Sequence, residues 1–177
     1  MDGRDQKAEH LPLEGSHPHL KKFFRLLPEL EKESDRGSVL ISCTYLDELL
    51  RQVLLAFLRE HKESARLVEG FNAPLGTFSA RATAAFALGL ITAREFEECQ
   101  ILRRIRNRFA HHVHVSFNTH DIEDMCKSLT MSAKDYGEVV VNARGQFNTA
   151  AVALIMNWTN RAAYVAKQRR TEQEWSY

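Results

Sequence analysis

The chain has 177 residues, of which 44% are hydrophobic and 27% are charged, and its formal net charge at pH 7 is +1. This length predicts a single domain with its own hydrophobic core, and a composition with only 8 glycines and 4 prolines excludes a disordered or fibrous chain. Because the net charge is close to zero, the chain as a whole has no attraction for nucleic acid or membranes. Any electrostatic function must therefore come from a local cluster of charge.

Helical periodicity dominates the first half of the chain. Residues 1–18 are polar and predict a flexible arm. A first helix is expected from residue 19 to about residue 33, with Pro28 as a bend or a break. Over about residues 38–61, apolar residues recur every three or four positions, which predicts the central core helix. The glycines and the proline in residues 62–78 predict a loop.

The second half continues the helical pattern. Residues 79–91 predict a short apolar helix. Thr92, with Glu95 three positions later, fits a capping box and sets the start of a long helix at about Thr92. A short helix over residues 121–129 and a final helix over about residues 147–168 follow. The residues that the final helix is expected to bury are Ala151, Leu154, Ile155, Trp158 and Tyr164.

The strand content predicted from this pattern is negligible. Residues 130–145 look irregular, and residues 138–141, which alone resemble a strand, are too few to change the class. We predict an all-α fold, a single-domain antiparallel helical bundle over residues 19–170 with a short tail at 171–177.

The cysteine content predicts a reducing environment. Cys43, Cys99 and Cys126 are far apart and include no CxxC pair, which favours reduced core thiols over disulfides or a zinc site. No apolar run approaches the roughly 20 residues that a membrane span needs, and the polar N-terminus does not predict a signal peptide. We expect a cytoplasmic protein that has no membrane contact and needs no cofactor.

The stretch ILRRIRNRFAHHVHVSF, residues 101–117, gathers four arginines and three histidines around one asparagine. On a helix that turns by about 100° per residue, its apolar residues share one arc that must face the core. Arg106 lies on the shoulder of that arc, while Asn107 and His111 share another face because they are four positions apart. The apolar residues of the arc are Ile101, Leu102, Ile105 and Phe109.

Two resemblances to known families involve this region. The pattern R-N-x-x-x-H in RNRFAH, residues 106–111, is similar to the signature of HEPN domains. The stretch APLGTFSARATAAFALGLITAREFEE, residues 73–98, resembles the mannitol operon repressor (MltR-like) family. HEPN domains are all-α bundles that commonly dimerise, and many of them cleave RNA without a metal. The MltR-like family is described as transcription regulators. The resemblances imply an HEPN/MltR-like bundle, a homodimer, and either an RNA substrate or a regulatory role.

The HEPN resemblance implies a specific chemistry for three residues. His111 would act as general base or acid, because imidazole exchanges protons near neutral pH. Arg106 would hold the phosphate through its guanidinium fork, and Asn107 would orient the imidazole or donate to the phosphate. RNA supplies its own 2′-hydroxyl nucleophile, so no metal is needed, and two copies meeting across a dimer axis would complete the site. The neighbouring residues expected to bind RNA are Arg103, Arg104, Arg108 and His112.

Other interpretations of the same residues stay open. Arg106 has a structural role if it pairs with Asp47, Glu48 or Glu98. The other basic residues match the partial negative charge that a helix carries at its C-terminus. Arg81 either pairs with a carboxylate on a neighbouring helix or extends the basic patch.

The alternative function is a non-catalytic MltR-like transcriptional regulator, a repressor that acts through a protein partner. Direct DNA binding is not expected, because histidines and a loop follow the basic helix instead of a short turn and a second helix. A metal site at His111, His112 and His114 is not expected either, because consecutive histidines seldom converge on one ion.

Overall fold

The structure is a computed structural model that describes residue 28 and residues 30–176. The predicted arm and most of the predicted first helix lie outside these residues. The described part is all-helical, which confirms the predicted fold class. Its helices are α3 (Asp35–Phe57), α4 (Lys62–Val68), α5 (Phe78–Ala87), α6 (Ala93–His111), α7 (His120–Lys127), α8 (Ala143–Thr159), α9 (Arg161–Val165) and the 3₁₀ turn η2 (Ala166–Gln168).

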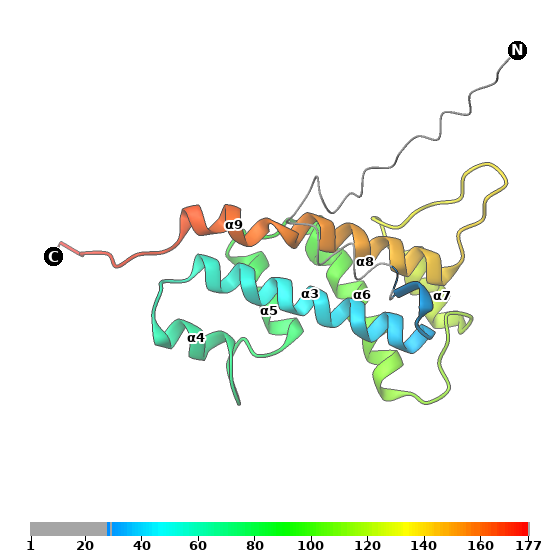
Figure 1. Cartoon of the computed structure of the whole chain (residues 1–177), viewed down its shortest axis with the longest axis horizontal. Helices are drawn as coiled ribbons and strands as arrows, with labels where there is room; N and C mark the ends of the chain where they lie inside the picture. The colour runs from blue at the N-terminus through cyan, green and yellow to red at the C-terminus, as the bar shows by residue number, and fades with distance from the viewer. Residues whose placement is uncertain (1–27, 29, 177) are drawn as a thin grey trace, which may run out of the picture.

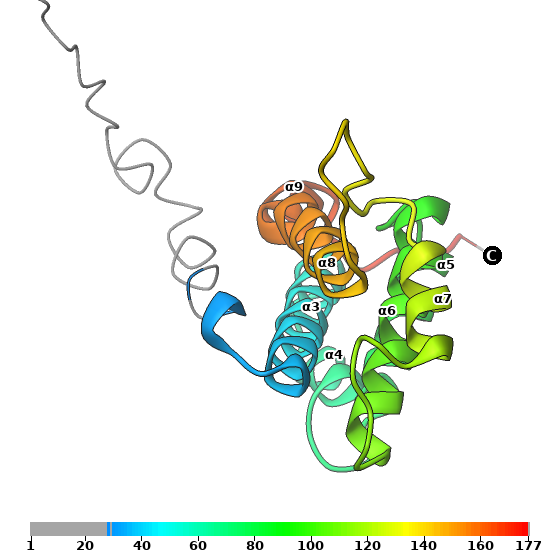
Figure 2. The same cartoon turned by 90° about the vertical axis from the view of Figure 1, so that its right-hand side faces the viewer.

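The helices form two layers that pack against each other, as Figures 1 and 2 show. One layer contains α3, α8 and α9, and the other contains α5, α6 and α7. Between them lies a core of aliphatic and aromatic side chains. The largest fully buried side chains include Trp158, Phe109 and Phe147. Burial of this apolar surface is the main force that holds the two layers together.

The direction of the helices is mixed. α6 runs antiparallel to α3, because Arg36 near the start of α3 donates to the Phe109 carbonyl near the end of α6. α8 runs in the same direction as α3: Arg144 pairs with Asp35 at 3.0 Å where both helices begin. The periodic pattern predicts which faces are buried, but it does not distinguish these two directions.

The central helix extends further toward the N-terminus than its apolar pattern predicts. The Ser34 side chain accepts a hydrogen bond from the Gly37 backbone N–H at 3.1 Å and caps the helix. The helix ends at Phe57, earlier than expected. Its fully buried residues follow the predicted period and include Val39, Leu46, Leu50, Val53 and Leu54.

The prediction of a loop over residues 62–78 is wrong in its first part, where α4 forms. The His61 ring accepts a hydrogen bond from the Glu63 backbone N–H at 3.2 Å, and Val68 is fully buried. A helix of seven residues is too short to show a convincing hydrophobic period.

The predicted capping box is confirmed at the start of α6. Thr92 accepts from the Glu95 backbone N–H at 3.2 Å, and Glu95 accepts from the Thr92 backbone N–H at 2.8 Å. These two bonds satisfy backbone donors that the first turn of a helix otherwise leaves free.

The predicted final helix is divided. It begins earlier, at Ala143, because the Asn142 side chain accepts from the Gly145 backbone N–H at 2.8 Å. It breaks at Asn160, which changes the face presented by the turn that follows. As a result, the prediction that Tyr164 is buried is wrong: this side chain is 65% exposed, and Val165 is buried instead. Residues 138–141 form no strand, only one isolated bridge between Tyr136 and Val139.

The three cysteines are free and buried, as predicted for core thiols. Burial raises the pKa of Cys43 and of Cys126 to about 12, and it raises the pKa of Cys99 as well. These thiols therefore stay protonated and unreactive near neutral pH. In the part of the chain that the structure describes, no helix combines the length and the apolar character needed to cross a membrane.

Candidate functional site

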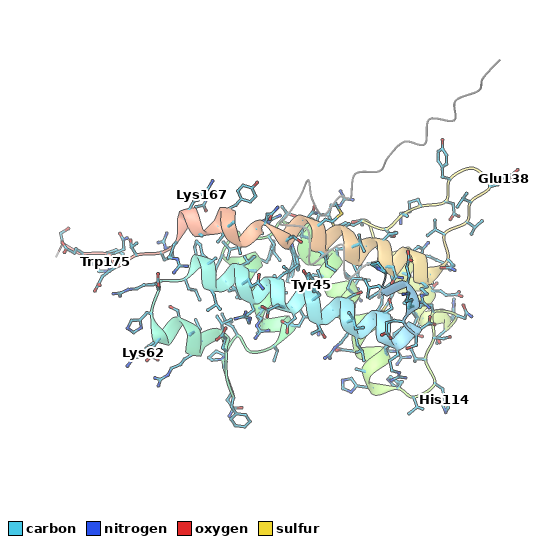
Figure 3. The ribbon with its side chains drawn as sticks, in the orientation of Figure 1. Tyr45, Lys62, His114, Glu138, Lys167 and Trp175 are labelled. Carbon is cyan, nitrogen blue, oxygen red and sulfur yellow. The ribbon has the colours of Figure 1, made fainter. Side chains whose placement is uncertain are left out.

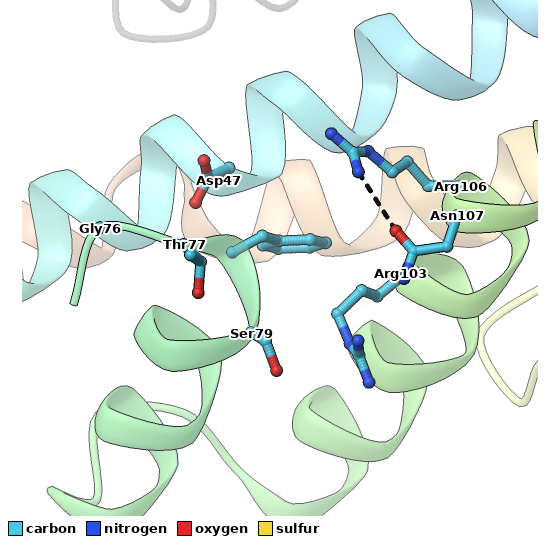
Figure 4. Close-up of a pocket in the computed structure, with 8 residues that line it drawn as sticks. Asp47, Gly76, Thr77, Ser79, Arg103, Arg106 and Asn107 are labelled. Carbon is cyan, nitrogen blue, oxygen red and sulfur yellow. Dashed lines mark hydrogen bonds between the residues drawn. The ribbon is translucent and has the colours of Figure 1, made fainter. Parts of the chain in front are cut away.

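A cavity of about 400 Å³ lies where α3, the start of α5 and the middle of α6 meet (Figure 4). α6 contributes Arg103, Arg106 and Asn107, which recur at intervals of three and four and so share one side of the helix. The core-facing side of α6 carries Leu102, Ile105 and Phe109, all fully buried. The other residues that line the cavity are Asp47, Gly76, Thr77, Phe78 and Ser79.

Arg106 and Asn107 are in direct contact. The Arg106 Nη1 donates to the Asn107 Oδ1 at 3.1 Å, as the dashed line in Figure 4 marks. Arg106 is exposed and Asn107 is half-buried. Among the described residues, no carboxylate lies within ion-pair distance of Arg103, Arg104 or Arg106.

The three carboxylates considered as partners for Arg106 bind other groups. Asp47 pairs with Arg81 at 2.8 Å. Glu48 accepts from Arg51 at 2.6 Å, and this hydrogen bond lowers the pKa of Glu48 to about 2. Glu98 is buried against the segment after α7, where it accepts from the backbone N–H groups of Thr130 and Met131 at 2.9 Å. The interpretation of Arg106 as a structural ion-pair residue is therefore wrong for these partners.

Arg81 pairs with a carboxylate on a neighbouring helix and does not extend the basic patch. Besides its ion pair with Asp47, it donates to the backbone carbonyls of Val68 and Leu75, each at 3.0 Å. Arg81 is 9% exposed, so it is a buried clamp between α3, α4 and the following loop rather than part of a basic surface.

His111 lies one turn beyond Asn107, at the end of α6, and is exposed. It does not line the cavity that Arg106 and Asn107 share. Its place is set by Arg36, which donates to the carbonyls of His112 and Val113 at 2.8 and 2.9 Å and to that of Phe109. This guanidinium neutralises the free carbonyls at the end of α6. The sequence interpretation did not identify Arg36, because 73 positions separate it from Phe109.

The residues expected to bind RNA differ in their surroundings. Arg104 is exposed, whereas Arg103 lines the cavity and donates from Nε to the Gln100 side chain at 3.2 Å. Arg108 pairs with Asp121 of α7 at 2.6 Å, which offsets its charge. His112 is exposed, and its ring lies 3.2 Å from the Arg108 guanidinium. Arg103 and Arg106 are thus the two residues of this basic stretch that line the cavity without a carboxylate partner among the described residues.

Thr77, Phe78 and Ser79 complete the cavity, and the sequence interpretation assigned them no role. The Thr77 hydroxyl accepts from the Ala80 backbone N–H at 3.2 Å and caps α5. A threonine immediately before an apolar helix is a recognisable capping signal, but it does not indicate that this turn faces α6. Within residues 28 and 30–176, no three His, Cys, Asp or Glu side chains converge as they would around a metal ion.

Comparisons with known proteins give one structural match. No family model matches the chain, and no curated protein matches it. The fold is similar to that of a chain in the X-ray structure of the MtlR–HPr complex from Escherichia coli, with a TM-score of 0.57 and 19% sequence identity. The match covers 80% of this chain and 96% of the other. The helical fold is therefore of the MtlR kind.

Proposed function

We propose that this protein is a non-catalytic regulator of transcription that acts by binding a protein partner of the HPr kind. The observation that carries the proposal is the fold match to a chain of the MtlR–HPr complex over four fifths of this chain. The resemblance of residues 73–98 to the mannitol operon repressor family points in the same direction.

An ordered aromatic loop supports partner binding. Phe71, between α4 and α5, is 97% exposed. The loop turns at Gly70 and Asn72, which have φ values of 98° and 59°, and its base is closed by a hydrogen bond from the Leu75 backbone N–H to the Leu67 carbonyl at 2.8 Å. Arg81 stabilises the same base by donating to the carbonyls of Val68 and Leu75. Because backbone bonds hold this loop, its backbone loses little conformational entropy on binding, so Phe71 is suited to anchor a partner.

The end of α6 favours a partner other than DNA. Residues 112–119 separate α6 from α7, and the first turn of α7 carries the carboxylates of Asp121 and Glu123. A DNA-reading pair of helices needs a tighter turn and a second helix with a basic or polar first turn.

The experiment that tests the proposal is a titration of purified HPr from Escherichia coli into the full chain, followed by calorimetry, with Escherichia coli MtlR as the positive control. We expect saturable binding with a Kd of roughly 1–100 μM, which corresponds to about 5–8 kcal/mol. NMR spectra of labelled HPr provide a second measurement. If MtlR binds HPr but this chain produces neither heat nor chemical-shift changes, the proposal is contradicted.

A second candidate function is metal-independent RNA cleavage by a homodimer. It is favoured by the open cavity beside Arg106 and Asn107 and by the exposed imidazole of His111 one turn away. If this candidate is right, the wild-type chain cleaves RNA in the presence of EDTA, and Arg106→Ala and His111→Ala each abolish cleavage. Arg66→Ala, which removes an exposed arginine of α4 outside this group, is the control and keeps it. RNA that stays intact with the wild-type chain eliminates this candidate.

A further inference from the structure

We propose that the cavity between α3, α5 and α6 binds a small organic phosphate, a phosphate monoester that carries a compact organic group. This ligand site goes beyond the proposed partner binding and does not depend on it. The inference rests on the charge, the free hydrogen-bond donors and the size of the cavity.

The charge of the cavity wall favours an anion. Arg103 and Arg106 are three positions apart on α6 and line the same hollow, and Figure 4 shows their side chains extending in different directions. Neither has a carboxylate partner among the described residues. Asp47 is the carboxylate in the wall, and the buried guanidinium of Arg81 already offsets its charge at 2.8 Å. Figure 4 shows the two guanidinium groups on either side of Asn107, so an anion in the cavity would offset the positive charge that both contribute to its wall.

Several hydrogen-bond donors in the wall are free, whereas Asp47 Oδ1 is a buried acceptor without a hydrogen-bond partner among the described residues. The Asn107 amide oxygen accepts from Arg106, so the amide nitrogen remains to donate into the cavity. Arg103 uses Nε for the Gln100 side chain, which leaves its two terminal nitrogens. The Ser79 side chain also lines the cavity, and its hydroxyl can donate. A phosphate oxygen accepts several hydrogen bonds at once, so this set of donors suits a phosphate group.

The size of the cavity calls for more than an inorganic ion. A volume of about 400 Å³ falls in the range of ligand pockets and far exceeds that of a phosphate ion. The half-buried ring of Phe78 lies in the wall and offers an apolar surface to an organic group. The first turn of α5 also borders the cavity, where its free backbone N–H groups add partial positive charge.

The test is a calorimetric titration of the full chain with three probes: inorganic phosphate, glycerol 3-phosphate and AMP. The variants are Arg103→Ala and Arg106→Ala. Arg104→Ala is the matched control, because it removes the same charge from the neighbouring position on α6 without touching the cavity. We expect one of the organic phosphates to bind, and each cavity variant to weaken its affinity about tenfold, as loss of a charge-assisted hydrogen bond does. Arg104→Ala is expected to change it less than about twofold.

Three outcomes would overturn the inference. The first is that none of the probes binds. The second is that Arg104→Ala weakens binding as much as Arg103→Ala, which indicates general attraction to a basic helix. The third is that inorganic phosphate binds as tightly as the organic phosphates, which leaves no role for an organic group. Phe78→Leu gives an independent check, because it should weaken the organic phosphate and leave inorganic phosphate unchanged. Because Arg103 lies in the cavity and not in the Phe71 loop, Arg103→Ala should still bind HPr if the proposed function holds.

Discussion

Glu95→Ala is expected to lower the free energy of unfolding by about 2–4 kcal/mol, because it removes a capping acceptor and the buried partner of the half-buried Arg161. The Glu95 side chain is almost completely buried and makes two kinds of polar contact. It completes the capping box with Thr92, and it pairs with Arg161 through both oxygens, at 2.8 and 3.3 Å. Arg161 also donates to the Leu90 carbonyl at 2.8 Å, so the same contact ties α9 to the turn before α6.

The effect of this substitution is measured by urea denaturation monitored by circular dichroism. Glu97→Ala is the matched control, because Glu97 is exposed in the same part of α6 and forms no ion pair with a described residue. We expect Glu97→Ala to change the unfolding free energy by less than about 0.5 kcal/mol. If the two variants differ by less than about 1 kcal/mol, the Glu95–Arg161 pair does not stabilise the fold as proposed.

The same residue shows what the sequence can and cannot predict. The capping box is a local signal, because Thr92 and Glu95 are three positions apart, and the start of α6 was predicted correctly from it. Arg161 is 66 positions away, and nothing in its neighbourhood marks it as the partner of Glu95. Two further long-range contacts are not marked in the sequence: Arg36 of α3 binds carbonyls at the end of α6, and Arg81 binds carbonyls at the base of the Phe71 loop. Periodicity predicts which face of a helix is buried, but long-range polar contacts depend on how the helices are placed.

The candidate site has the same limit. The sequence puts Arg106 on the shoulder of the apolar arc and Asn107 on another face of the helix, and the structure places both beside one cavity. The opposite wall comes from residues 76–79, about 30 positions earlier, and only the fold brings it near α6. His111 follows the helical spacing as well, yet α6 ends there, and the ring lies beyond the residues that line the cavity.

Phe71→Ala is expected to weaken binding to HPr about 30-fold or more, the loss that follows removal of an interface hot spot worth about 2 kcal/mol. Because this ring is almost fully exposed, its removal leaves no cavity in the core. The unfolding free energy should therefore stay within about 0.5 kcal/mol of the wild-type value. Calorimetric titration with HPr and urea denaturation of the same preparation measure the two quantities.

A second exposed aromatic residue provides the matched control for this prediction. Tyr136 is 86% exposed and belongs to the loop that contains Glu138. Figure 3 shows Glu138 at the opposite end of the molecule from Lys62 of α4, which lies in the helix before the Phe71 loop. If Phe71 anchors the partner, Tyr136→Ala binds HPr as the wild-type chain does. Equal losses for the two variants would mean that exposed aromatic rings attract HPr without a defined site, and an effect confined to Tyr136→Ala would move the interface to the other end of the bundle.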